Sequence, residues 1–580
     1  MKAGASTVAE TIVESLDRQG VRTVWGVVGD ALNPITDAIR RQEAIEWIGV
    51  RHEEAGAFAA SAQAQLTGTL AVCMGTVGPG SIHLLNGLYD AKKSHAPVLA
   101  ICGQVPLAEI GTDFFQEVDN DALFADVGVF CQTLVSPTQM PTMLERAVQS
   151  ALQRRGVAVL TVPGDVAAAD LPKDAPSPRF VSEPATSVSD PAAIHRAAQA
   201  IDAAGSVAIL AGIGAREARA ALLALAEKLA APIVLTLKAK EGLEHDNPYE
   251  LGQNGLIGNP VAYDALADSD LMLLVGTDFP YPDWIPTGKV VVQIDLRGEH
   301  IGRRTAVTHG VVGDARLALE ALEEAVGEKP DRSHLERSRE KYAQWRADQS
   351  ELTDPGFDHK GIVGRVRSKL DNRDARIRPE ALAAAVDRQA PDDAIFTSDT
   401  GMSTVWLSRF VTLRGSRRLI GSYNLGSMAN AMPQALGAQA LDRDRKVVAF
   451  CGDGGLTMLL GDLITAVSHQ LPVCIVVFDN GRLGMVKLEQ ERGGLPEFGT
   501  ELANPDLAAV ATAIGLHGVR VEDPDQLDAA VREALGHRGP VLLDAITNPD
   551  EVSLPPKVTP SDAWGFAIAK LSESLESRGR

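Results

Sequence analysis

The segments Cys451-Gly452-Asp453-Gly454-Gly455 and Phe478-Asp479-Asn480 bracket the part of the sequence that decides the fold. The apolar run 446–451 (KVVAFC) predicts a buried strand, the periodic segment 456–470 a helix, and 472–478 (PVCIVVF) a second buried strand. Such a crossover is right-handed and joins parallel strands, so both strands end at one edge of the sheet. The sequence therefore predicts a parallel α/β sheet with Asp453 and Asn480 side by side at that edge.

These two side chains suggest a ligand. A carboxylate and a carboxamide are hard oxygen ligands that suit Mg²⁺, and a helix N-terminus beside them favours phosphate. Glycines let the backbone approach closely. We therefore expect a magnesium-bound diphosphate, although the glycine motif alone is also consistent with a simple strand-to-helix turn and Asn480 with a turn residue.

Length, net charge and cysteine spacing limit the kinds of protein and partner that the sequence is consistent with. A chain of 580 residues exceeds a single core, and a net charge of −21 argues against nucleic acid or anionic membrane as a partner. The five cysteines show no paired spacing, as expected of thiols in a reducing compartment. We found no signal-peptide core and no apolar run of membrane-spanning length, so we expect a cytoplasmic protein.

Strand-like and helix-like segments alternate in three blocks of similar size, which predicts an α/β protein with three doubly wound parallel-sheet domains. The expected divisions are a first domain at 1–180, a central domain at 191–326, a charged connector at 327–378, a third domain at 379–550 and a C-terminal tail at 551–580.

Glu53 follows the strand-like run AIEWIGV, and a second glycine turn, Gly78-Pro79-Gly80, follows the next strand. A carboxyl group held in an apolar cleft can carry or share a proton. A carboxylate at a helix N-terminus also stabilises the helix dipole. That structural reading is preferred for Glu54 and, taken in isolation, for Glu53.

Together these motifs resemble the thiamine-diphosphate enzymes of the acetolactate synthase and pyruvate oxidase superfamily, most closely the pyruvate:quinone oxidoreductase branch. The similarity covers about residues 7–570 and is carried by VWGVVGD, RHEEAGAFAA, GPGSIHLLNGLYDA, FFQE, GTDFPY, GSMANAMPQALGAQ, CGDGG and VVFDN. It implies thiamine diphosphate, Mg²⁺ and FAD as cofactors. It also implies a homo-oligomer, usually a tetramer, in which two subunits share each active site.

The resemblance also implies roles for individual residues near thiamine diphosphate. Glu53 contacts the pyrimidine ring, the Gly426 carbonyl accepts from its amino group, and Met428 supports the bent cofactor. The metal is held by Asp453, Asn480 and the backbone carbonyl of Arg482. Further positions expected at this cofactor are Ser427, Gly454, Gly455, Met458, Leu483, Gly484, Met485 and Val486.

The central block gives a weaker signal for FAD. Gly212-Ile213-Gly214-Ala215 lacks the third glycine of a standard dinucleotide fingerprint. The resemblance supplies flavin-contacting positions, each of which could singly be a strand-end residue: Asn254, Gly255, Leu256, Ile257, Thr277, Asp278, Phe279, Pro280, Tyr281 and Asp295.

The segment after Asn480 bears on the reaction. Acetolactate synthases carry Gly-Met-Val and then a Trp three residues after the Val, whereas this chain has Gly484-Met485-Val486 and then Glu489, as pyruvate oxidases do. Met485 departs from the Phe usual among oxidases. Phe115 and Gln116 match substrate-channel residues, so the expected catalytic set is Glu53, Phe115, Gln116, Met485 and Glu489.

The expected reaction is oxidative decarboxylation of pyruvate, or a related 2-oxo acid, to acetate and CO₂, with electrons passing through FAD to a quinone or another acceptor. Carboligation to acetolactate and non-oxidative decarboxylation are the alternatives within the superfamily. A flavoprotein without thiamine diphosphate, or a non-catalytic oligomeric scaffold, is the alternative outside it.

The C-terminal segment weakens the expectation of membrane binding that quinone-linked relatives suggest. Trp564, Ile568, Leu571 and Leu575 share a helical face, but the opposite face is acidic, a poor complement for an anionic surface. We expect this segment to dock on its own subunit, with peripheral association at the inner membrane face as the alternative. The basic patch at 359–378 is expected to be a solvated face.

Overall fold

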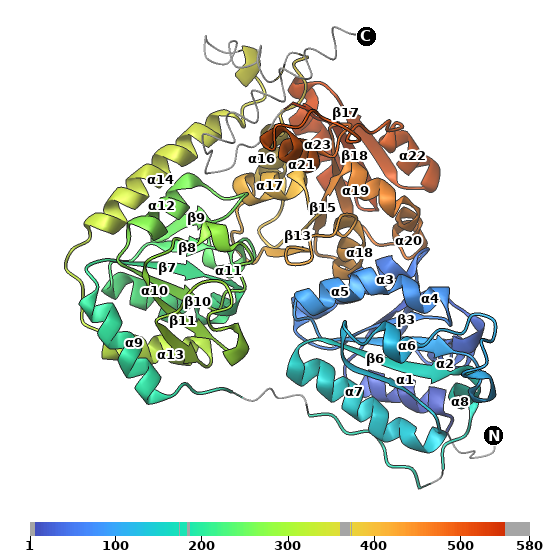
Figure 1. Ribbon diagram of the computed structural model, residues 1–580. Coiled ribbons are helices and arrows are strands. Elements are labelled where there is room, and N and C mark those ends of the chain that lie inside the picture. The colour runs from blue at the N-terminus through green and yellow to red at the C-terminus, as the bar shows by residue number, and fades with distance from the viewer. Residues whose placement is uncertain (1–5, 173, 182–185, 360–371, 373, 551–580) are drawn as a thin grey trace.

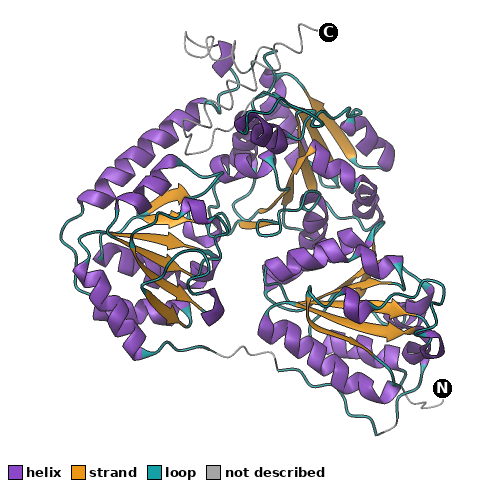
Figure 2. Ribbon diagram, viewed as in Figure 1, coloured by secondary structure: helices purple, strands orange, loops and turns teal. Residues whose placement is uncertain are grey.

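A computed structural model describes residues 6–172, 174–181, 186–359, 372 and 374–550. Three six-stranded sheets of parallel strands form three separate layered units (Figures 1 and 2). In the first sheet, Ala71 and Cys73 belong to one buried cluster and Val72 and Met74 to another, so both faces are covered. The prediction of three doubly wound α/β domains is confirmed.

The first sheet has the strand order β2-β1-β3-β4-β6-β5. Its strands are β1 (Thr23–Gly26), β2 (Glu46–Gly49), β3 (Ala71–Gly75), β4 (Val98–Gln104), β5 (Gly128–Thr133) and β6 (Val157–Pro163). The accompanying helices are α1 (Val8–Arg18), α2 (Asn33–Arg40), α3 (Glu53–Thr67), α4 (Pro79–His83), α5 (Leu85–Lys93), α6 (Asn120–Leu123), α7 (Met140–Arg154) and α8 (Gly164–Ala168).

The second sheet has the order β12-β11-β10-β7-β8-β9. Counted within the domain this is 6-5-4-1-2-3, the strand order of dinucleotide-binding folds. Its strands are β7 (Val207–Ala211), β8 (Ile233–Leu235), β9 (Glu250–Gln253), β10 (Leu271–Val275), β11 (Val290–Asp295) and β12 (His309–Val312). Its helices are α9 (Pro191–Ala203), α10 (Arg219–Lys228), α11 (Lys240–Leu243), α12 (Pro260–Asp268) and α13 (Ala315–Ala325), and the long α14 (Ser333–Glu351) follows.

The third sheet, β14-β13-β15-β16-β18-β17, repeats the order of the first strand for strand. Its strands are β13 (Ile395–Ser398), β14 (Arg418–Gly421), β15 (Val447–Gly452), β16 (Cys474–Asp479), β17 (His517–Val521) and β18 (Val541–Ile546). Its helices are α16 (Pro379–Gln389), α17 (Met402–Phe410), α18 (Ala431–Leu441), α19 (Asp453–Met458), α20 (Leu463–Ser468), α21 (Gly484–Arg492), α22 (Leu507–Ile514) and α23 (Leu527–Gly536).

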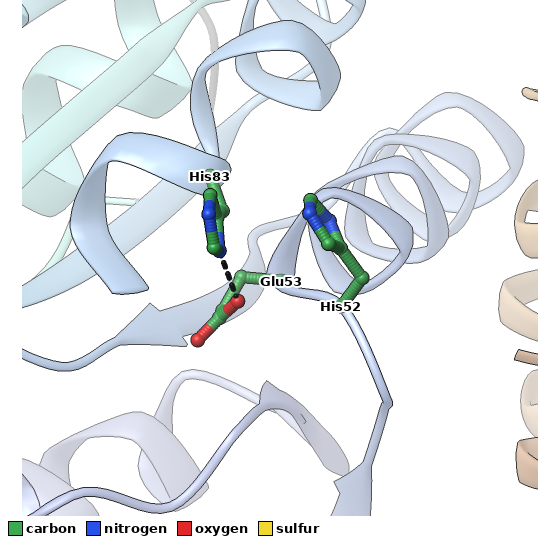
Figure 3. A group of neighbouring side chains, drawn as sticks. All are labelled: His52, Glu53 and His83. Carbon is green, nitrogen blue, oxygen red and sulfur yellow. Dashed lines mark hydrogen bonds and ion pairs between the residues drawn. The ribbon is translucent and has the colours of Figure 1, made fainter. Parts of the chain in front are cut away.

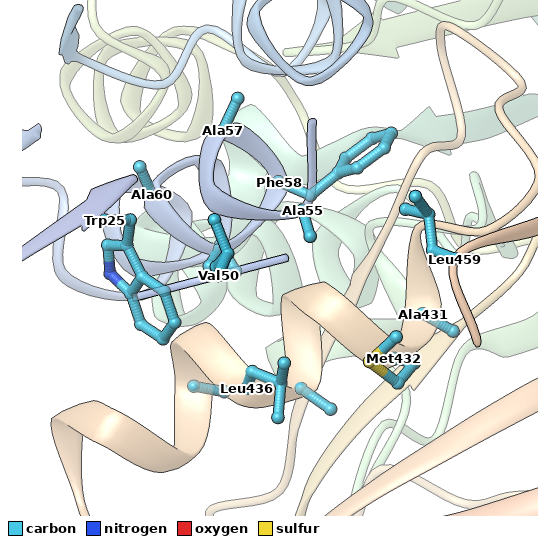
Figure 4. Packing of buried hydrophobic residues seen from close by; sticks show 14 of the residues in the cluster. Trp25, Val50, Ala55, Ala57, Phe58, Ala60, Ala431, Met432, Leu436 and Leu459 are labelled. Carbon is cyan, nitrogen blue, oxygen red and sulfur yellow. The ribbon is translucent and has the colours of Figure 1, made fainter. Parts of the chain in front are cut away.

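One hydrophobic core joins the first and third domains through α3 and α18, which pack against each other (Figure 4). The contact is close because both helices present small residues. A Cβ atom at Gly437 would overlap the backbone of Ala59, and the Gln63 side chain donates to the Gly437 carbonyl over 3.1 Å. The two domains are therefore fixed to one another by backbone proximity as well as by apolar burial.

The helix predicted over 456–470 is interrupted. α19 ends at Met458, a 3₁₀ turn covers Leu460–Asp462, and α20 begins at Leu463. At the interruption the Asp462 carboxylate accepts from the backbone N–H of Arg51 over 2.8 Å. Apolar periodicity carries no information about this contact with another domain, so it could not predict the break.

Two predictions lie largely or wholly outside the described residues: the solvated basic patch at 359–378, of which 360–371 and 373 are not described, and the docking of the segment 551–580. Among the helices that the structure does describe, none combines the length and the apolarity needed to cross a membrane.

The close approach of α3 and α18 gives a stability prediction. Gly437→Val should cost about 1–3 kcal/mol through overpacking and lower the Tm in circular dichroism, because the added side chain meets the Ala59 backbone. The control is Gly536→Ala, where nothing lies within 4 Å of an added Cβ atom. Equal Tm values for the two variants would contradict the proposed constraint.

Candidate functional site

A cavity of about 220 Å³ lies at the carboxyl edge of the third sheet, where β15 and β16 end. Asp453 and Asn480, which the sequence predicts as metal ligands, both line this cavity. The other predicted positions in its lining are Gly426, Met428, Gly454, Gly455, Arg482, Leu483, Gly484, Met485 and Val486. Ser427 and Met458 are not in the lining: Ser427 accepts from Asn86 of the first domain, and Met458 is exposed.

Hydrogen bonds hold the two predicted metal ligands. The Asp453 Oδ2 atom accepts from the Gly481 N–H over 2.9 Å and from the Asn504 side chain over 2.7 Å. The Asn480 Oδ1 atom accepts from the Arg482 N–H over 3.0 Å. Burial, together with the nearby Asp479 carboxylate, raises the pKa of Asp453 to about 7. This donor set fits a divalent cation, because a cation would supply the positive charge that the buried carboxylates lack.

Asp399 also lines this cavity, although it was not predicted as a site residue. It directly follows β13 in the chain. One of its oxygens accepts from the Ala431 N–H at the start of α18 over 2.9 Å, while the other has no hydrogen-bond partner. Burial raises its pKa to about 7. Its carboxylate occupies the space that a Cβ atom at Gly455 would need. The signal that identified Asp453, a carboxylate at a strand end, also applies to Asp399.

A second cavity of about 260 Å³ lies between the central and third domains, with Ser94 and His95 of the first domain in its lining. It contains most of the positions predicted for FAD: Asn254, Gly255, Leu256, Ile257, Asp278, Phe279, Pro280 and Tyr281. Thr277 and Asp295 do not line it. The Thr277 hydroxyl accepts from the Phe279 N–H, and Asp295 accepts from the Arg297 N–H.

The two cavities adjoin. Thr400, Gly401 and Met485 line both, and Glu489, one turn further along α21, lines the second. Met485 and Glu489 therefore lie where the two cavities meet and beside the central domain.

Cationic groups gather around Asp278 in the second cavity. Arg303 and Arg304 lie 3.6 and 3.7 Å from its carboxylate. Lys238 lies in the lining of the cavity, where desolvation lowers the pKa of its ammonium group. Lys238 and the two arginines beside Asp278 provide cationic groups near an anionic ligand such as a dinucleotide diphosphate. Gly212 and Gly214 allow two turns to pack closely, because Cβ atoms at these positions would overlap the backbone of Gly276.

Glu53 belongs to a separate half-site on the first domain. Its Oε2 atom lies 2.9 Å from Nδ1 of His83, and the His83 ring stacks on His52 with centroids 4.4 Å apart (Figure 3). Potential metal-ligand atoms of these three residues lie within 4.8 Å of one another, but the stacked rings do not converge on a point as ligands would. His83 was not predicted, although it follows the glycine turn by three residues.

The predicted channel residues join this half-site. Gln116 has a φ of 68°, and its backbone lies against the position where Gly78 would carry a Cβ atom. The Phe115 side chain is 79% exposed. None of Glu53, Phe115 and Gln116 lines the cavity beside Asp453 in the same chain. Within one chain, Asn86 links the neighbourhood of Glu53 to Ser427 at the edge of that cavity, because its Nδ2 atom donates to Glu54 and to Ser427.

Comparison with known proteins identifies all three domains. Residues 6–123, 194–322 and 399–545 match the N-terminal TPP binding, central and C-terminal TPP binding domains of thiamine pyrophosphate enzymes. The "Putative thiamine pyrophosphate-containing protein YdaP" of Bacillus subtilis is 36% identical, over 99% of this chain and 97% of the relative. Pyruvate oxidase of Lactiplantibacillus plantarum is 32% identical over 93% and 88%. Acetolactate synthase isozyme 2 large subunit of Escherichia coli is 32% identical over 97% and 100%.

The glycine motif gives a prediction about stability. Gly455→Ala should lower the Tm, because the new methyl group collides with the buried Asp399 carboxylate that caps α18. Gly452→Ala should leave the Tm unchanged, because nothing lies within 4 Å of its added Cβ atom. Differential scanning calorimetry of both variants tests this, and a stable Gly455→Ala protein would refute the packing role of Asp399.

Proposed function

Because the chain belongs to the family of thiamine pyrophosphate enzymes, we propose that it oxidatively decarboxylates pyruvate with thiamine diphosphate, Mg²⁺ and FAD. The balanced reaction is pyruvate plus water plus an oxidised acceptor giving acetate, CO₂ and the acceptor reduced by two electrons and two protons. The final acceptor is a quinone or another two-electron acceptor.

The observation that carries this proposal is the junction of the two cavities. The cavity beside Asp453 suits a metal-bound diphosphate, and the second contains most of the positions expected to contact FAD. Thr400, Gly401 and Met485 border both. A carbon centre in one cavity and a flavin in the other would be separated only by these three residues. Electrons would therefore have a short path from one cavity to the other.

The chain's own groups have distinct tasks. Asp453, Asn480 and the backbone carbonyl of Arg482 would hold a Mg²⁺ ion, which would neutralise the charge of a bound diphosphate. Glu53 would bind the pyrimidine ring, and its Oε2 atom lies 2.9 Å from Nδ1 of His83, which would orient the carboxyl group. Bound thiamine diphosphate supplies the nucleophilic carbon and the electron sink for loss of CO₂, and FAD supplies the oxidant.

Each active site is shared between two copies of the chain in this proposal. Glu53 does not line the cavity beside Asp453 in its own chain, and the first and third domains both carry exposed apolar side chains. Phe115 is 79% exposed on the first domain, while Met458 and Phe498 are 63% and 83% exposed on the third domain. Burying these surfaces against each other would bring Glu53 of one subunit to the cavity of another. We propose a homo-oligomer, with a tetramer as the expected state.

Carboligation to acetolactate is the second candidate. It is favoured by the acetolactate synthase relative, which matches this chain at the same identity as the pyruvate oxidase relative does. Glu489, which lines the second cavity beside Tyr281, favours the oxidase by the resemblance noted above.

Purified protein decides between the two reactions. We expect it to be yellow, to lose its flavin absorbance on anaerobic addition of pyruvate, and to reduce an artificial dye with one acetate formed per two electrons. Acetolactate formation with a flavin that stays oxidised would overturn the oxidase proposal in favour of carboligation.

Subunit mixing tests the shared site. Glu53→Gln and Asp453→Asn subunits should each be inactive as homo-oligomers, because each lacks one half-site. The two variants are co-expressed with different tags and purified as mixed oligomers. These should regain about a quarter to a half of wild-type activity, because one of the two sites in each mixed pair combines an intact Glu53 with an intact Asp453. No recovery in mixed oligomers would show that each site uses a single chain.

A further inference from the structure

Asn504 donates a hydrogen bond to Asp453, one of the predicted metal ligands. It lies in the loop between α21 and α22, and its Nδ2 atom donates to Asp453 Oδ2 over 2.7 Å and to Asp479 Oδ1 over 2.8 Å. The two carboxylate residues are 2% and 6% exposed. One carboxamide nitrogen, which carries two hydrogens, therefore bridges two buried carboxylates.

A backbone group makes the same pair of contacts. The Gly481 N–H lies 2.9 Å from Asp453 Oδ2 and 3.2 Å from Asp479 Oδ1. The Asn504 side chain and the Gly481 N–H thus each donate to both carboxylates. These hydrogen bonds offset the repulsion between the negative charges of Asp453 and Asp479.

The bridge borders a pocket other than the first cavity. Asp479, Gly481 and Asn504 line that other pocket, whereas Asp453 and Asn480 line the first cavity. Asp453 Oδ2 is fully engaged by the bridge, so the other carboxylate oxygen is the one left to bind a cation.

We propose that Asn504 is a positioning residue of the cation site: it locks the Asp453 carboxylate by one oxygen, through the bridge to Asp479, and so presents the other oxygen to the metal. The inference rests on the cation–diphosphate site of the proposed function but not on FAD or the electron acceptor. A purely structural reading would have Asn504 only anchor its loop to the sheet. The two readings differ in what they predict for cation affinity.

The test measures cation binding directly, with Mn²⁺ as the probe in paramagnetic resonance titrations at saturating thiamine diphosphate. Asn504→Leu keeps the size of the side chain and removes both donations, and Asn504→Ala removes the side chain. Groups that orient a metal ligand typically contribute 10- to 100-fold in affinity. We expect the Mn²⁺ Kd to rise about 10- to 100-fold in both variants, with kcat recovering to within about twofold when Mg²⁺ is saturating.

Asn247→Ala is the matched control. Its Nδ2 atom donates to the Leu243 carbonyl over 2.8 Å, in the central domain and outside the linings of the two pockets at the cation site. Its Mn²⁺ Kd should stay within about twofold of wild type. Tm values measured without cation show whether each variant is folded, and the size-matched Leu variant serves if the Ala variant is not.

The outcomes separate the two proposals. Wild-type affinity for Mn²⁺ in a folded Asn504→Leu protein would overturn the positioning role while leaving the proposed function intact. Failure of wild-type protein to bind Mn²⁺ with thiamine diphosphate would overturn the cation site itself. A lower Tm with unchanged Kd would assign Asn504 a structural role only.

Discussion

The packing of α3 against α18 is the constraint on which the arrangement of the site depends. Small side chains allow the two helices to approach until Gly437 has no room for a Cβ atom, and Gln63 adds a buried hydrogen bond across the contact. This contact fixes the first domain on the third within one chain. Glu53, at the first turn of α3, is fixed with it, outside the lining of its own chain's cavity.

The first and third domains share a strand order, and they use it in the same way. The third strand of each, β3 and β15, leads into a glycine turn, Gly78–Gly80 in one and Gly454–Gly455 in the other. In both turns a carboxylate lies close to the position of an added Cβ atom: Glu53 Oε1 lies 3.1 Å from that position at Gly80, and Asp399 overlaps it at Gly455. The glycines serve close packing as much as ligand approach.

The sequence predicted what depends on local pattern and on strand direction. Apolar runs identified β15 and β16, and the parallel crossover placed Asp453 beside Asn480 without any knowledge of tertiary structure. Residues that reach the site from distant loops gave no such signal. Asn504 bridges two carboxylates across 51 and 25 positions, and Asp462 breaks its helix to contact Arg51, 411 positions away. The resemblance to known enzymes supplied the flavin-facing positions, but not the contacts that keep Thr277 and Asp295 out of that cavity.

Thr400, Gly401 and Met485 form the boundary between the two cavities. At Gly401, whose φ is 150°, nothing lies within 4 Å of an added Cβ atom. Met485 completes the boundary with an unbranched side chain that can change its rotamer, which a rigid aromatic ring could not do as freely. Oxidation needs this boundary to hold a donor close to a flavin, whereas carboligation needs room in the first cavity for a second 2-oxo acid. Because Met485 faces both cavities, a change in its conformation would alter both distances together.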